Sequence, residues 1–297
     1  YLLHNNSLFI LCLLNIIMQT LDDLRLYVET YYGHDFWRGV APRGRDAEKN
    51  PEELITKFFQ HDLPTKTRMF REYIDFTFNH FVKPRIKDEP MSNILSMPCA
   101  NGEEAFTLAI HGLENDLYIE VEGRDINPGL IDIASSGKVY IPTFRFKQLQ
   151  PWIEDGFLKR IPKYSRGGIV TANVEVPSFV KDRCQFFIHD ILERSLDEHY
   201  DVIYCINLFV YLSDNGKDAA LENLVSGLNT GSLLIVDQPY WVPPPNKRNG
   251  MPRYNAKNEE IYGWKVDLNE FYASLHKKDL GLKKVSKFDT HNVYEKT

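Results

Sequence analysis

The chain has 297 residues, of which 43% are hydrophobic and 26% charged, and its net charge at pH 7 is −6. These totals exclude a collagen-like or wholly disordered chain and leave enough apolar residues for a large core. The mild acidity gives no sign of a basic surface, so we expect no nucleic acid partner.

The four cysteines are widely separated, and none forms a CxxC pair; they are Cys12, Cys99, Cys184 and Cys205. Isolated cysteines of this kind favour reduced thiols in a cytoplasmic protein over disulfides or a zinc site. We therefore expect a cytoplasmic protein without a bound metal.

Residues 1–18 form an apolar extension of uncertain status. The run Ser7–Ile17 is shorter than the ~18–20 residues that span a bilayer. No basic residue precedes it, which argues against a signal peptide. We expect residues 1–17 to lie outside the functional protein, for example through a misassigned start before Met18. The alternative is an anchor, and membrane contact is expected only if this segment is real and exposed.

Residues 19–84 are predicted to form an N-terminal helical region and a linker. Helices are expected over Thr20–Tyr32, Pro51–Gln60 and Arg68–Val82, because apolar residues recur there at three- and four-residue steps. Pro84 is expected to end the last of them.

Residues 85–297 are predicted to form the main domain, because strands and helices alternate along it. This alternation favours an α/β fold with a doubly wound, mostly parallel sheet, whose ligands bind beyond the carboxyl ends of the strands. The expected strands are Ile94–Met97, Leu117–Val121 (ending at Asp125), Gln185–Ile188, Val202–Ile206 and Ser232–Val236, and the expected helices are Glu103–Leu113, Gly129–Ser136 and Lys217–Leu228.

Two segments depart from this alternation. Residues 139–181 are rich in proline and short β-like runs, which predicts a small inserted β subdomain or lid. The segment Lys284–Lys296 resembles two short strands of an antiparallel edge.

The turn NILSMPCANGEEAF, Asn93–Phe106, is the first place where a ligand is expected. It follows the first strand and opens a helix, yet it lacks both GxGxxG and the P-loop pattern. A helix N-terminus favours anions, but Glu103 and Glu104 would repel a pyrophosphate there. A cationic ligand reverses the sign of this argument, and S-adenosylmethionine carries both an ammonium and a sulfonium.

A second acid is expected at the end of the second strand to accept hydrogen bonds from ribose hydroxyls. Asp125 in VEGRDIN stands there. Such an acid also serves NAD enzymes, so Asp125 alone does not choose between cofactors. The missing glycines and the paired glutamates favour the methyl donor.

Five segments in this order resemble the CheR-type chemotaxis receptor methyltransferases, which methylate glutamate side chains with S-adenosylmethionine and release S-adenosylhomocysteine. They are PTKTRMFRE, MPCANGEEAFTLAI, GRDINPGLIDIASSGKVY, FFIHDIL and YDVIYCINLFVYL. The resemblance implies a Rossmann-like class I methyltransferase fold over roughly Leu21–Lys296.

The resemblance also implies roles for single residues. Arg71 is expected to hold the acceptor carboxylate, and Tyr211 to orient either the acceptor or the sulfonium. Glu104 is expected to hold the cofactor's amino group and Asp125 its ribose, whereas Glu103 is expected to be only a helix-start charge. The implied cofactor contacts are Thr65, Thr67, Arg71, Ala100, Gly102, Glu104, Asp125, Ile126, Asp190, Ile191 and Asn207, with Asp190 and Ile191 beside the adenine.

The resemblance implies a protein acceptor carboxylate, most simply on a chemoreceptor. Ile206 stands where the family has an arginine, the N-terminal region is short, and the Pro-rich Pro239–Pro252 has no counterpart. Two alternatives therefore stay open, namely a methyltransferase acting on a small molecule or another protein, and a catalytically silent module that binds S-adenosylmethionine.

Overall fold

The structure, a computed structural model, describes residues 25–26, 71–139, 146–166, 169–236, 253–254, 260–261, 275, 280–286 and 292–297. Residues 1–18, the helix expected over Pro51–Gln60 and the segment Pro239–Pro252 lie outside these ranges. Of the helix expected over Thr20–Tyr32, only Arg25 and Leu26 are described, and both are helical.

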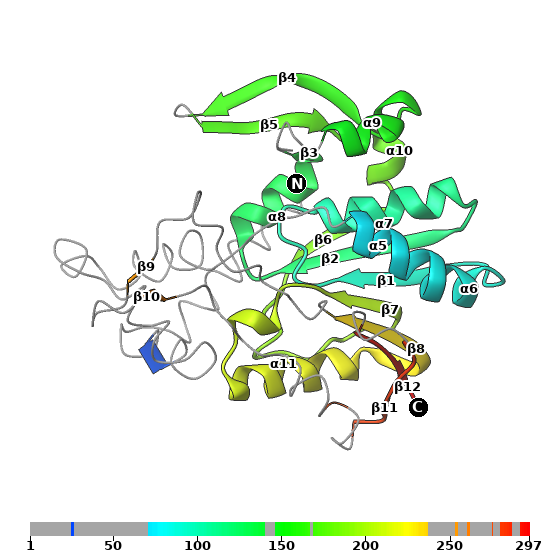
Figure 1. The fold of residues 1–297 in the computed structure, drawn as a ribbon, viewed down its shortest axis with the longest axis vertical. Coiled ribbons are helices and arrows are strands. Elements are labelled where there is room, and N and C mark those ends of the chain that lie inside the picture. Colours follow the sequence, from blue (N-terminus) through cyan, green and yellow to red (C-terminus); the bar gives the residue numbers. More distant parts are fainter. Residues whose placement is uncertain are drawn as a thin grey trace.

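A seven-stranded sheet forms the centre of the fold (Figure 1). Its strands are β1 (Ser92–Ser96), β2 (Ile119–Asp125), β6 (Cys184–Ile188), β7 (Tyr200–Cys205), β8 (Leu228–Val236), β11 (Leu282–Lys284) and β12 (Asn292–Lys296). The strand order is β11-β12-β8-β7-β1-β2-β6. The five strands from β8 to β6 run parallel, and β12 pairs antiparallel with both β8 and β11. This topology confirms the predicted doubly wound, mostly parallel sheet and its antiparallel edge.

Helices cover both faces of this sheet (Figure 1). They are α5 (Arg71–Thr77), η3 (Phe78–Val82, a π-helix), α6 (Lys83–Ile86), α7 (Glu103–Glu114), α8 (Pro128–Ser136), α9 (Phe146–Glu154), α10 (Ser178–Lys181), η5 (Phe209–Tyr211, a 3-10 helix) and α11 (Asp214–Ser226). Ile94 of β1 packs in the cluster that contains α5 and α7, whereas its neighbour Leu95 packs in the cluster that contains α11. The alternation follows from the two-residue period of a strand.

The helix that begins at Arg71 does not end before Pro84, as the sequence predicted, but continues to Ile86. The π-helical turn explains the difference, because the Lys83 N–H bonds to Phe78 O, five residues back. Pro84 then stands in the first turn of α6, where a missing N–H costs little.

The predicted β insert forms a second sheet of three antiparallel strands, ordered β3-β5-β4. Its strands are β3 (Lys138–Val139), β4 (Lys159–Arg166) and β5 (Ile169–Glu175), and β4 and β5 stand apart from the main sheet in Figure 1. The helix α9 between β3 and β4 was not predicted, since Pro151 lies inside it. A further short pair, β9 (Arg253–Tyr254) and β10 (Glu260–Ile261), is also antiparallel.

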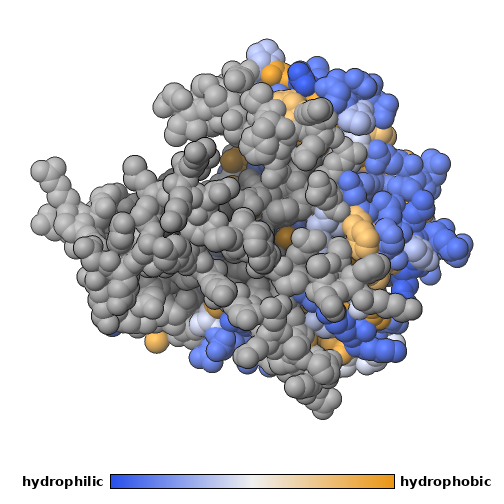
Figure 2. Space-filling model, viewed as in Figure 1, coloured by the Kyte–Doolittle hydropathy of each residue, from blue (hydrophilic) through white to orange (hydrophobic). Residues whose placement is uncertain are grey.

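The described surface is largely polar on the face shown in Figure 2, where few hydrophobic side chains lie among the hydrophilic ones. Among the described residues, no helix combines the length and the apolar character that crossing a membrane requires. Cys99, Cys184 and Cys205 are free thiols, and Cys12 lies outside the described ranges.

Gly102 is the N-cap of α7 and has a φ of +84°, which an L side chain adopts only with strain. A Cβ at this position would lie 2.9 Å from the Cβ of Ala134 and 3.0 Å from the ring of Phe186. Only glycine therefore allows α7 to start this close to α8 and β6.

Replacing Gly102 by alanine should destabilise the fold more than the same change at Gly156. Gly156 has a φ of +81° but nothing within 4 Å of its would-be Cβ, so Gly156→Ala isolates the backbone strain of about 1–2 kcal/mol. Gly102→Ala adds a steric clash of about 1–3 kcal/mol. Urea denaturation of both variants measures the difference, and equal losses would contradict the packing argument.

Candidate functional site

The carboxyl ends of β1, β2, β6 and β7 meet at one edge of the sheet. The chain order reverses at β1, which pairs with β2 on one side and with β7 on the other. Ligands of doubly wound sheets bind outside such a reversal point. The turns after these four strands carry most of the residues that the sequence singled out.

Asp125 ends β2 and joins two of these turns. Its Oδ2 accepts a hydrogen bond of 2.9 Å from Ala100 N, and its Oδ1 accepts one of 2.9 Å from Asn127 N. The residue is 1% exposed, and burial raises the pKa of its carboxyl to about 6 although the backbone N–H groups oppose this. A carboxylate buried to this degree gains from further hydrogen-bond donors, such as ribose hydroxyls.

The two glutamates at the start of α7 are both buried. Glu104 Oε1 accepts a hydrogen bond of 2.7 Å from Ser96 Oγ at the end of β1. Glu103 Oε1 accepts one of 3.2 Å from Asn101 Nδ2. Glu103 is thus a buried, hydrogen-bonded acid in the first turn of α7 and not a solvated one.

Further acceptors gather in the same turn. Asn101 Oδ1 is buried and has no hydrogen-bond partner. Ala100 adopts a left-handed φ of 49°, like Gly102 after it, so the backbone of the turn is tightly curled. The turn thus presents acceptors and negative charge, which fit a ligand that brings an ammonium group and hydroxyls.

The turns after β6 and β7 complete this edge. Asp190 and Ile191 follow β6 and are buried, and the backbone N–H of the preceding His189 bonds to Asp125 O at 3.0 Å. After β7, Asn207 is half-buried with a left-handed φ of 62°, and Tyr211 is half-buried in the short helix η5.

The remaining positions that the sequence singled out have different outcomes. Ile126 is partly buried against the cluster that contains α11. Ile206, which stands where the family has an arginine, is buried in the opposite cluster and offers no polar contact. Thr65 and Thr67 lie outside the described residues, and of Arg71 the structure describes the backbone at the start of α5.

Helix α5 is tied to the ends of the strands by two tyrosines. Tyr73 Oη donates a hydrogen bond of 2.5 Å to Val236 O at the end of β8. One turn later, Thr77 Oγ1 lies 3.1 Å from Tyr204 Oη of β7. The start of α5, where Arg71 lies, is therefore held near the carboxyl edge of the sheet.

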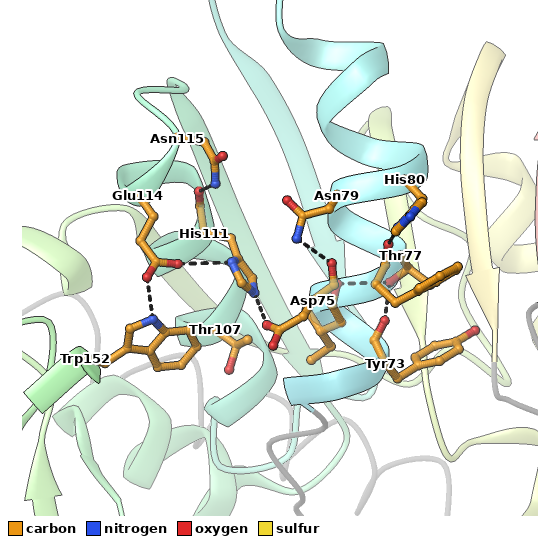
Figure 3. A network of polar contacts seen from close by, with 12 residues as sticks. Tyr73, Asp75, Thr77, Asn79, His80, Thr107, His111, Glu114, Asn115 and Trp152 are labelled. Carbon is orange, nitrogen blue, oxygen red and sulfur yellow. Dashed lines mark hydrogen bonds and ion pairs between the residues drawn. The ribbon is translucent and has the colours of Figure 1, made fainter. Parts of the chain in front are cut away.

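A buried ionic network connects α5 with α7 and α9 (Figure 3). His111 Nε2 lies 2.6 Å from Asp75 Oδ1, and its Nδ1 lies 3.2 Å from Glu114 Oε2. The other oxygen of Glu114 accepts a hydrogen bond of 2.7 Å from Trp152 Nε1. Both ring nitrogens of His111 face carboxylates, an arrangement that favours the doubly protonated imidazolium form of the ring.

Comparison with known proteins identifies the family of this chain. The family described as "CheR methyltransferase, SAM binding domain" matches residues 65–247. The chain belongs to the CheR methyltransferase family. The cofactor of this CheR domain is therefore S-adenosylmethionine, as the sequence predicted, and the acceptor-rich turn before α7 fits it.

Curated relatives of this CheR chain are named as chemotaxis protein methyltransferases. A "Chemotaxis protein methyltransferase" of Campylobacter jejuni is 28% identical over 160 residues, which are 52% of this chain and 56% of that protein. "Chemotaxis protein methyltransferase 2" of Vibrio cholerae is 21% identical over 187 residues, covering 60% of this chain and 59% of that protein. The matches thus span little more than half of each relative.

Among solved structures, the glycopeptide N-methyltransferase MtfA complexed with sinefungin is 13% identical, with a TM-score of 0.36. The match covers 68% of this chain and 61% of that chain.

Sequence reasoning did not assign a role to Ser96, Asn101 or Arg124, and it expected His111 and His189 to be structural rather than catalytic. Ser96 was read as part of a strand end, and its hydroxyl instead orients Glu104. A serine between the apolar Leu95 and Met97 of the expected strand was the available signal, because its hydroxyl must find a partner when buried. Among the described residues, no group of three metal-ligating side chains occurs.

Cofactor binding should weaken as the pH falls through the pKa of Asp125, near 6. The cofactor's hydroxyls bind the ionised carboxylate better than the protonated acid, so the affinity is full above pH 7. At pH 5 the dissociation constant of S-adenosylhomocysteine should rise by about tenfold, since one pH unit below a pKa corresponds to ~1.4 kcal/mol. Calorimetry between pH 5 and 8 tests this, with Asp125→Asn as the control that binds weakly and without this pH dependence.

The stability of the fold should fall as the pH rises through the pKa of His111. Burial lowers this pKa, but the hydrogen bonds and charges of Asp75 and Glu114 outweigh burial and raise it above 6.5. The stabilisation is therefore complete below pH 6.5 and is lost above the raised pKa.

Melting curves from pH 5.5 to 9 measure this loss, at about 2–4 °C for each kcal/mol. In His111→Gln the pH dependence should flatten. The matched control is His80→Gln, which changes an exposed histidine of the adjoining π-helix. If His111→Gln retains the wild-type pH profile, the imidazolium assignment is wrong.

Proposed function

We propose that this protein is an S-adenosylmethionine-dependent O-methyltransferase that esterifies a carboxylate, most simply a glutamate side chain of a chemotaxis-type receptor. The observation that supports the cofactor side best is the buried acceptor set at the end of β1 and β2, formed by Glu103, Glu104 and Asp125. Family membership and the printed names of the relatives support the reaction class.

The cofactor supplies an activated methyl group, because its sulfonium is a good leaving group. In the proposal, Glu104 pairs with the ammonium of the methionine moiety, and Asp125 accepts hydrogen bonds from the ribose. Asp190 and Ile191 lie against the adenine, while Ala100, Gly102, Ile126 and Asn207 form the rest of the wall. The turn excludes water, which strengthens each of these contacts.

On the acceptor side, the protein orients the acceptor carboxylate and does not need to remove a proton from it. A glutamate carboxylate has an ordinary pKa near ~4.3 and is already ionised at neutral pH, so no general base is needed. Arg71, with Thr65 and Thr67 nearby in the sequence, holds the acceptor carboxylate through a bidentate guanidinium contact. Tyr211 orients the reacting oxygen at the end of β7. Placement in line with the leaving sulfur then supplies the rate enhancement.

The proposed substrate is a chemoreceptor, and the proposed location is the cytoplasm. The relatives are named for chemotaxis, which favours a chemoreceptor as partner. Ile206, buried in the core where the family has an arginine, favours a second candidate, a silent module that binds the cofactor without turnover.

Two measurements separate these candidates. Calorimetry with S-adenosylhomocysteine should detect binding, and its failure overturns every version of the proposal. Transfer of a labelled methyl group to chemoreceptor-bearing membranes should then give a base-labile ester. Binding without ester on membranes or on a panel of small carboxylic acids identifies the silent module, whereas ester on a small acid alone identifies a different acceptor.

Arg71→Ala should lower kcat/KM for the acceptor by about 10- to 100-fold, because a charge-assisted contact contributes about 1.5–3 kcal/mol. The dissociation constant of S-adenosylhomocysteine should change less than about threefold. Arg85→Ala is the matched control, since Arg85 forms a half-exposed ion pair with Glu295 at 3.1 Å. Equal losses of turnover and cofactor binding in Arg71→Ala would contradict the acceptor-side role.

A further inference from the structure

The connection between β6 and β7 lacks a helix. It runs through residues 189–199, from the edge strand past β2 and β1 to β7, and consists of turns and irregular backbone. Crossovers between parallel strands are usually helical, and a helix satisfies its own backbone groups. Here other groups must hold the segment that presents Asp190 and Ile191.

Side chains take over part of this task. Asp190 Oδ1 accepts a hydrogen bond of 2.9 Å from Leu192 N, and Asn223 Nδ2 of α11 donates one of 2.7 Å to Ile191 O. His189 Nε2 lies 3.1 Å from Arg194 O, which closes the turn from its far side. The backbone N–H of Arg194 also donates a hydrogen bond of 3.0 Å to Asp190 O. The Arg194 carbonyl that faces His189 therefore belongs to the same turn as Asp190.

The second nitrogen of His189 decides which proton the ring carries. His189 Nδ1 lies 3.4 Å from a terminal nitrogen of Arg124. A guanidinium can only donate, so Nδ1 must accept and carries no proton. A carbonyl oxygen can only accept, so Nε2 must carry the proton and donate. The two contacts are compatible only with the neutral Nε2–H tautomer.

Arg124 is itself firmly held. It is 8% exposed, forms an ion pair with Glu122 and lies 5.9 Å from the ring centre of Tyr200. Burial and then the charge of Arg124 lower the pKa of His189 to about 4, so the ring stays neutral at physiological pH. The other charged groups near His189 are Arg194 and Asp197 of the same connection.

We propose that Arg124 and His189 are positioning residues for adenine recognition, in which Arg124 fixes the tautomer of His189 and His189 fixes the turn that presents Asp190 and Ile191. This inference rests on the proposed function, because it takes the adenine to lie against that turn. Neither residue touches the cofactor in this scheme, and both act through the turn that carries Asp190 and Ile191.

The proposal has a consequence for base selectivity. Adenine carries an amino group that can donate to a carboxylate, whereas hypoxanthine carries a carbonyl oxygen at the same position that a carboxylate repels. A turn held in place should therefore prefer S-adenosylhomocysteine over S-inosylhomocysteine. A loosened turn should lose this preference, because sites built to bond a particular group discriminate only while they are rigid.

Calorimetry of both ligands with wild-type protein and two His189 variants tests the inference. His189→Gln keeps an N–H donor and should stay within about threefold of wild type for both ligands. His189→Leu removes the donor and should weaken S-adenosylhomocysteine by about tenfold but S-inosylhomocysteine by less than about threefold. Arg124→Lys keeps a donor and should behave as His189→Gln does.

The ratio of the two dissociation constants separates positioning from general destabilisation. A protein that is merely less stable loses affinity for both ligands alike, and such an equal loss in His189→Leu overturns the inference. An unchanged ratio, or a wild-type protein that does not discriminate, overturns it too. If wild type binds neither ligand, the proposed function itself fails.

If His189→Leu does not fold, nitrogen NMR of the histidines in wild-type protein tests the same point. His189 should show a protonated Nε2 and an unprotonated Nδ1 from pH 6 to 8. Either a protonated Nδ1 or a doubly protonated ring in this range overturns the inference.

Discussion

The structure and ligand preference of the site depend on how the chain compensates the free-energy cost of burying carboxylates at the carboxyl edge of the sheet. Asp125, Glu103 and Glu104 are all less than 10% exposed, and a buried charge is stable only when hydrogen bonds or an opposite charge compensate it. The chain supplies part of that compensation from backbone N–H groups, Ser96 and Asn101. A cationic, hydroxyl-bearing ligand supplies more of it. Ligand binding at this site is therefore expected to raise the free energy of unfolding, because the ligand compensates buried charge that the chain alone compensates only in part.

The surrounding structure serves to hold this edge in register. Gly102 lets α7 begin against α8 and β6, and Tyr73 anchors the start of α5 at the end of β8. His111, between Asp75 and Glu114, then joins α5 to α7 away from the edge. Each of these contacts joins elements that are distant in sequence, so the geometry of the site depends on tertiary packing more than on local preference.

Most of the fold could be predicted from the sequence because periodic apolar residues report burial directly. The strands that contain Ile94 and Val202 and the helix that contains Phe106 all lie where that period places them. The helix α9 was not predicted because a proline such as Pro151 usually breaks a helix. The helix end expected at Pro84 was wrong because the apolar pattern does not reveal the π-helical turn that precedes this proline.

For the site, the missing glycines and the paired negative charges of Glu103 and Glu104 were enough to predict the cofactor class, which Asp125 alone did not decide. The sequence could not reveal the burial of Glu103 or the contact between Arg124 and His189. Those depend on which side chains two strands bring face to face. Residues such as Thr65 and Thr67 stay predictions.

The position of β12 has a consequence for how the protein forms on the ribosome. Asn292–Lys296 is inserted between β8 and β11, and its Val293 and Tyr294 are fully buried. The pairing surface of β8 therefore stays open until residue 296 has left the exit tunnel, although the residues that bind the cofactor emerge much earlier. At about 5–20 residues per second, synthesis of the segment between β8 and β12 takes several seconds. During that interval β8 is an unpaired edge, and such an edge can pair with strands of other molecules.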